Sequence, residues 1–87
     1  MMITKEQCRA ARALIGWSRS DLASAAKVSE RTITDFERGA RSPIHASLAA
    51  IAQALESGGV EFIPENGGGP GVRLAKPQEN DSWNEAE

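Results

Sequence analysis

The chain has 87 residues, a formal net charge of −2, one cysteine and one histidine. A chain this short buries only about 60% of its unfolded surface, so we expect a second copy to add stability. One cysteine excludes a disulfide framework, and with one histidine it also excludes a multi-ligand zinc site, so we expect no metal and no other cofactor. No apolar run is long enough to span a membrane and no signal-peptide core is present, so we expect a cytoplasmic protein.

Start and stop signals in residues 1–58 predict four helices. Thr4 and Gln7 form a capping box for the first helix, which Gly16 ends. Ser18 opens a second, shorter helix over about residues 19–26. It repeats the pattern of a hydroxyl followed three residues later by a polar side chain, here Asp21. The apolar residues of the first helix recur at helical spacing and are expected to face the core: Cys8, Ala11, Leu14 and Ile15.

The third and fourth helices follow after short connections. Ser29 caps the third, and Gly39 supplies a left-handed stop. Ser42 is expected to cap the fourth with Pro43 in its first turn, and two glycines at 58–59 close it. The expected core residues are Ile33 and Phe36 in the third helix and Leu48, Ile51, Ala52 and Leu55 in the fourth.

After residue 58 the composition changes. Residues 60–63 and 72–74 alternate like short strands around a turn rich in glycine and proline, which predicts a β-hairpin within 59–75. An isolated hairpin is barely stable, so it must pack on the helices or pair with another chain. Residues 76–87 are acidic and without periodicity, so we expect a disordered tail. The predicted fold is therefore mainly α, with a helical domain over 1–58, the hairpin and the tail.

The second and third helices form a compact pair, because only Lys27 and Val28 separate them. Ala23 is small enough for two helices to cross closely at that position, and Val28 fills the turn. With Ile33 and Phe36 facing inward, one stripe of the third helix points outward and suits a major groove about 12 Å wide. The stripe consists of Glu30, Arg31, Thr34, Asp35 and Arg38.

Residues 19–39 resemble the helix-turn-helix of the Cro-like phage repressors and the xenobiotic-response-element regulators, and the likeness extends over about residues 5–56. The matching signals are Leu22-Ala23, Val28-Ser29, Ile33, Glu37-Arg38-Gly39, Pro43 and Ile51-Ala52. The resemblance implies a four-helix, lambda-repressor-like domain that binds double-stranded DNA. This chain departs from the family at the turn, where glycine is common and Lys27 stands, and at residue 19, where glutamine is common. The hairpin also replaces the family's usual fifth helix.

The outward stripe supplies the candidate base-reading residues, at positions that match the family's readers: Glu30, Arg31, Thr34 and Asp35. Arg31 can bond guanine, either carboxylate can accept from cytosine N4, and Thr34 can contact a thymine methyl. The alternative is a solvated helix face of mixed charge. The candidate phosphate contacts are Arg19, Ser29, Arg38 and Arg41, at helix starts and just after the third helix.

The resemblance also pairs Arg12 with Glu37 as an inner salt bridge between the first and third helices, so Glu37 is interpreted as structural. Removing one partner of such a pair strands a charge at a cost of roughly 3–5 kcal/mol. The hypothesis is that Glu37→Ala unfolds the domain.

Together these features predict a homodimeric transcriptional regulator, a repressor, which places residues 30–38 in the major groove of an operator. The hairpin is the candidate dimer contact. The alternative is an antitoxin-like or adaptor module that contacts a protein partner through the hairpin or the acidic tail. Residues 1–58 carry a net +2 and residues 59–87 a net −4, so only the helical part suits DNA. The sequence contains no nucleophile with a base partner, so we do not expect an enzyme.

Overall fold

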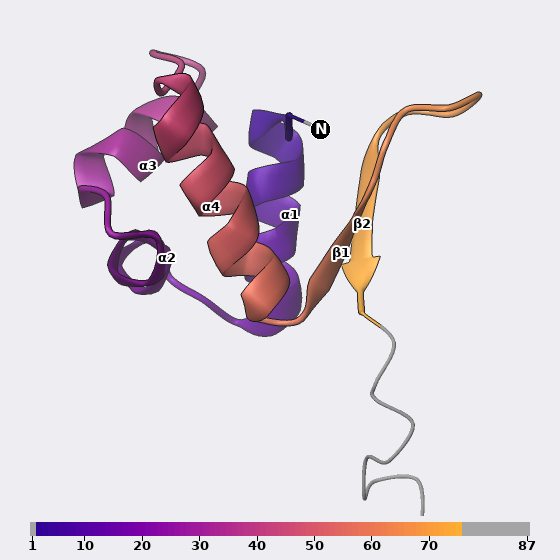
Figure 1. Cartoon of the computed structure of the whole chain (residues 1–87), viewed down its shortest axis with the longest axis horizontal. Helices are drawn as coiled ribbons and strands as arrows, with labels where there is room; N and C mark the ends of the chain where they lie inside the picture. The colour runs from indigo at the N-terminus through magenta and orange to yellow at the C-terminus, as the bar shows by residue number, and fades with distance from the viewer. Residues whose placement is uncertain (1, 76–87) are drawn as a thin grey trace, which may run out of the picture.

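The computed structural model describes residues 2–75 and contains four helices followed by a two-stranded hairpin (Figure 1). The predicted fold class is confirmed, while the predicted tail at 76–87 lies outside the described residues. The elements are α1 (Lys5–Ile15), α2 (Arg19–Ala26), α3 (Glu30–Glu37), α4 (His45–Ser57), β1 (Val60–Ile63) and β2 (Gly71–Leu74).

The helix starts follow the capping chemistry of the sequence in three cases out of four. Capping boxes open α1 at Thr4 and α2 at Ser18, and the Ser29 side chain accepts the Thr32 N–H to open α3. The prediction that Ser42 caps α4 is wrong, because α4 begins at His45 with no side-chain cap. Ile44 is the N-cap residue instead, with an extended backbone and with its oxygen accepting the Leu48 N–H at 3.0 Å, so Pro43 lies before the helix and not in its first turn.

The helical core forms where α1, α2, α3 and α4 meet. Of the predicted core residues, Leu14 remains 42% exposed, and Ile15 and Ala52 are only half-buried. Leu14 lies at the edge of the α1 stripe, and Ala54 on α4 is buried in its own right. The fully buried apolar side chains are Cys8, Ala11, Leu22, Ile33, Ile51 and Leu55.

The hairpin is antiparallel and packs on the helices. Val60 and Phe62 of β1 are buried in the same core as the helices, so residues 2–75 share one hydrophobic core. Gln7, itself buried, donates from Nε2 to the backbone oxygens of Ile63 at 3.3 Å and Gly71 at 2.8 Å. The same side chain closes the α1 capping box, so one residue holds the start of α1 and both strands together.

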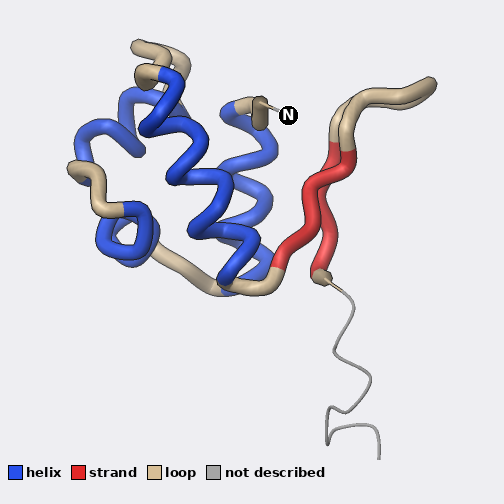
Figure 2. The backbone as a smooth tube through the Cα atoms, in the orientation of Figure 1, coloured by secondary structure: helices blue, strands red, loops and turns tan. Residues whose placement is uncertain are grey.

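The arrangement separates the third helix from the hairpin. α1 and α4 lie between them, and the loop that joins the strands extends away from the helices (Figure 2). A surface on α3 and a surface on the hairpin can therefore be occupied at the same time.

Candidate nucleic-acid interface

The connection between α2 and α3 is a tight turn, closed by a hydrogen bond from the Val28 N–H to the Ala23 oxygen at 3.1 Å. Ala23 is 7% exposed, as its predicted place at the helix crossing requires. Lys27 ends α2 with φ +60°, the left-handed conformation that L residues adopt at a cost of about 1 kcal/mol. The sequence therefore retains a strained lysine where glycine would be relaxed.

The outward stripe of α3 is open to solvent, as predicted. Glu30, Arg31 and Arg38 are exposed, and Thr34 and Asp35 are half-buried. The opposite face packs in the core, where Ile33 is fully buried and Phe36 is 7% exposed. α3 thus presents its polar side chains on a helix whose other face is packed against the core.

Two of the candidate readers contact each other. Arg31 Nε lies 3.5 Å from Asp35 Oδ2, one helical turn apart, with the Arg31 side chain 87% exposed and that of Asp35 23% exposed. The structure places them in contact, so a substitution of Asp35 also changes the surroundings of the Arg31 guanidinium.

The candidate phosphate-binding residues differ in whether their side chains already form bonds within the protein. Arg38 and Arg41 are exposed just after α3, and the Arg41 N–H donates to the Asp35 oxygen at 3.3 Å, which folds the loop back over the helix. The Ser29 hydroxyl is engaged as the α3 cap and contacts the Thr32 hydroxyl at 2.9 Å. Arg19 is bonded to a buried carboxylate.

That carboxylate belongs to Glu37, which is fully buried at the end of α3. Arg12 holds it with two bonds, Nη2 to Oε1 at 2.7 Å and Nε to Oε2 at 2.8 Å, so the pair implied by the resemblance is present. Arg19 Nε adds a bond to Oε1 at 3.1 Å, and the Cys8 thiol donates to Oε2 at 3.1 Å. Burial raises the pKa of Glu37, but hydrogen bonds from Arg12, Cys8 and Arg19 outweigh it and leave the pKa below its ordinary value.

Comparison with known families agrees with this geometry. A helix-turn-helix family model matches residues 9–62, more than half of the chain, and includes α2, the turn and α3. The chain belongs to the xenobiotic-response-element helix-turn-helix family. Domains of this family are DNA-binding regulator domains and not enzymes. No curated protein matches the chain. Within residues 2–75, no helix is long and apolar enough to cross a membrane.

The helix-turn-helix domain carries two further cations that the sequence analysis missed, both on α1 and close to the end of α3. Arg9 donates from Nη1 to the Glu37 backbone oxygen at 2.8 Å. Lys5 Nζ lies 2.7 Å from the place that a Cβ at Gly39 would take, and glycine is needed there for its φ of +76°. The spacing of Lys5, Arg9 and Arg12, which places them on one side of a helix, is the signal that could have identified them.

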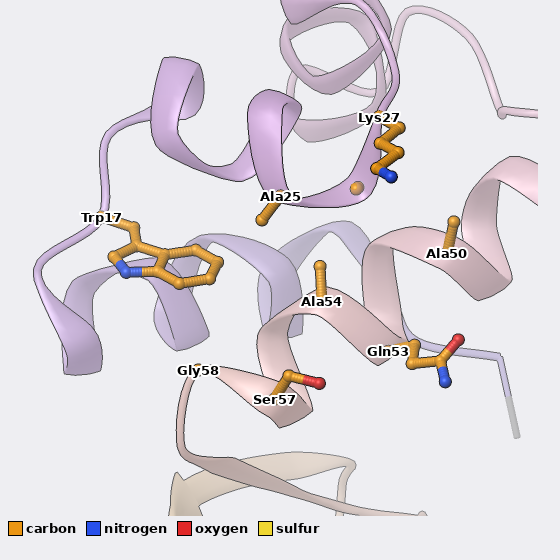
Figure 3. A pocket seen from close by; sticks show the side chains of 9 residues that line it. Trp17, Ala25, Lys27, Ala50, Gln53, Ala54, Ser57 and Gly58 are labelled. Atoms are coloured by element: carbon orange, nitrogen blue, oxygen red, sulfur yellow. The ribbon is translucent and has the colours of Figure 1, made fainter.

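A hollow between α2 and α4 lies outside the predicted interface of this helix-turn-helix domain (Figure 3). Alanine methyl groups and the Trp17 ring line most of it, and Lys27 stands at its rim. A Cβ at Gly58 would lie 2.8 Å from Ile15 Cδ1 and 2.9 Å from the Trp17 ring, so glycine permits this close approach. No lining residue comes from α3, so the hollow is distinct from the outward stripe.

Proposed function

We propose that the protein is a transcriptional repressor that recognises a specific double-stranded DNA sequence by placing α3 in the major groove. The observation that carries this proposal is the division of α3 between a buried apolar face and an exposed polar stripe, in a domain of a DNA-binding family. A helix held in this way can enter a groove without losing its own packing.

In this proposal Arg31 reads guanine through O6 and N7, and Thr34 contacts a neighbouring thymine methyl. Glu30 accepts from cytosine N4. Asp35 either accepts from cytosine or holds the Arg31 guanidinium, in keeping with the 3.5 Å contact between them. Two carboxylates in the stripe repel phosphates, so binding away from the operator is weak.

The phosphate contacts are assigned to Arg19, Ser29, Arg38 and Arg41, which flank the stripe. The start of α4 supports this assignment, because its first N–H groups have no side-chain cap and helix N-termini favour phosphate. The net +2 of residues 1–58 agrees with a DNA partner for this part of the chain.

The test is selection of bound duplexes from a random pool by the full-length protein. We expect an enriched inverted repeat whose half-site contains guanine. Arg31→Ala should remove the guanine preference, while Arg73→Ala, which removes a hairpin arginine, should leave it unchanged. Failure to enrich any sequence at moderate salt would contradict the proposal. The repressor role requires lower expression from a reporter promoter that carries the selected site.

We further propose a homodimer in which the hairpin pairs with its twin, with half-sites about 34 Å or a multiple apart. The Ala75 N–H donates to the Gly59 oxygen at 2.8 Å. Because bonded and non-bonded pairs alternate in an antiparallel ladder, the next pair, Val60 and Leu74, directs its backbone groups outward. Leu74 is also 57% exposed, so β2 offers an apolar edge for a second copy.

Sedimentation of two variants tests this edge. Leu74→Pro removes the outward N–H and should give a monomer, since proline is tolerated on an edge strand but cannot donate. Leu74→Val keeps that N–H and an apolar side chain, and it should remain dimeric. A proline variant that dimerises as strongly as the unaltered protein would exclude β2 as the contact.

The second candidate is an antitoxin-like or adaptor module with a protein partner. The exposed Glu30, the Asp35 carboxylate and the net −2 of the chain favour it. Salt dependence distinguishes the two candidates, because a dimer that contacts about six phosphates should show a log–log slope near −5. A protein partner should show a much shallower slope.

A further inference from the structure

Glu37 gathers more positive charge than its carboxylate neutralises. Arg12 and Arg19 both bond to the carboxylate, and Arg9 bonds to the backbone oxygen of the same residue. Three guanidinium groups therefore bond to one residue at the junction of α1, α2 and α3, two of them to its carboxylate and one to its backbone oxygen. The one carboxylate on α2, that of Asp21, accepts the Ser18 N–H in the capping box. The junction of the three helices therefore carries an excess of positive charge, and the arginine side chains that supply it are partly buried.

The two arginines on the carboxylate are used differently. Arg12 is fully engaged, because Nε and Nη2 bond to Glu37 and Nη1 donates to the Trp17 oxygen at 3.0 Å, and its side chain is 18% exposed. Arg19 bonds to Glu37 through Nε alone and its side chain is 36% exposed. Within residues 2–75, neither terminal amino group of Arg19 forms a hydrogen bond.

A guanidinium group is planar, so a bond at Nε fixes the direction of its two terminal amino groups. Arg19 is also the first residue of α2, at the end of the helix where the macrodipole is positive. The amino groups of Arg19 are thus held in one orientation at a place that favours an anion. Lysine at this position would have a single ammonium group for both tasks.

We propose that Glu37 is a positioning residue for DNA binding: its carboxylate holds Arg19 by Nε so that the terminal amino groups grip a backbone phosphate. This inference rests on the proposed function and assigns the buried ion cluster a role beyond stability. A chain of contacts then runs from Arg12 in the core through Glu37 and Arg19 to the phosphate. Orienting a long side chain before binding removes an ordering cost that corresponds to about two- to tenfold in affinity.

A double-mutant cycle on Arg19→Gln and Glu37→Asp tests the proposal, with a fluorescently labelled duplex that carries the sequence enriched in the selection as the probe. Arg19→Gln should weaken binding about tenfold and reduce the salt slope by about 0.9 for each subunit. Glu37→Asp keeps the charge but withdraws it by one methylene. It should weaken binding about two- to tenfold when Arg19 is present and not at all in the Arg19→Gln background.

The exposed pair on the hairpin provides the matched control. Arg73 bonds to Glu61 with distances of 3.1 and 3.2 Å, so Arg73→Gln and Glu61→Asp repeat the same two changes away from the proposed interface. Sedimentation establishes that both control variants keep the oligomeric state of the unaltered protein, and neither should then change affinity or show coupling. Thermal melting of every variant establishes which are folded at the temperature of the binding assay.

Equal effects of Glu37→Asp in both backgrounds, or no effect in either, would overturn the positioning role. If the unaltered protein binds no duplex, the proposed function fails as well, and that result is distinct from additive effects in a protein that binds. If Glu37→Asp does not fold, Arg19→Lys replaces it in the test. Arg19→Lys should lose nearly as much affinity as Arg19→Gln despite its charge, and full affinity would overturn the proposal.

Discussion

Glu37→Gln should destabilise the domain strongly, because it removes the negative charge on which two arginines converge. The side chain is fully buried and accepts four hydrogen bonds, with distances of 2.7, 2.8, 3.1 and 3.1 Å. Breaking a buried ion pair costs roughly 3–5 kcal/mol. Arg12 and Arg19 are 18% and 36% exposed, so both can recover some hydration, which places the cost near 3 kcal/mol.

A domain of this size has about 4–13 kcal/mol of stability in total, so the loss should be large on that scale. It corresponds to a fall in Tm of about 12–24 °C, measured by circular dichroism and by urea unfolding. Glu61→Gln is the control, since its ion pair with Arg73 is exposed and such pairs contribute little. Equal melting temperatures for the two variants would refute the reasoning that the buried cluster holds α1, α2 and α3 together.

Four further predictions concern single residues. Lys27→Gly should raise the free energy of unfolding by about 1 kcal/mol in a urea titration because it relieves a φ of +60°, whereas Ala25→Gly within α2 should lower it. Burial and the bond to Glu37 raise the pKa of the Cys8 thiol, so a thiol reagent should react with it only after denaturant is added. The pKa of Glu37 is lowered by folding, so its contribution to stability is present above pH 4.5 and should be lost as pH falls through the lower folded value; an acid titration that shows no such loss would contradict this. Gln7→Ala removes both bonds to the hairpin and should cost about 1–3 kcal/mol, seen as faster hydrogen exchange in β1 and β2.

Local sequence determined the helices, the turn and the hairpin. Capping boxes at Thr4 and Ser18 and a left-handed Gly16 act within a few residues, so the positions of α1 and α2 could be predicted from neighbours alone. The spacing of Ile33 and Phe36 determined which side of α3 is buried. The residues of the opposite side could therefore be predicted to face outward. The start of α4 was misplaced because Ile44 keeps an extended backbone and becomes the N-cap without a side-chain bond, which leaves the serine and the proline before it outside the helix.

Contacts between residues far apart in the chain could be decided only by the tertiary structure. The sequence offered Arg19 as a free phosphate contact, but packing of α2 against α3 brings its Nε to Glu37, eighteen residues away. Gln7 looked like a capping residue alone, yet it also bonds to the hairpin at a separation of up to 64 residues. Caps and periodicity depend on backbone geometry within one or two turns, and so the sequence determined them. The partners of a long polar side chain depend on where other elements come to lie, and that is settled only when the core closes.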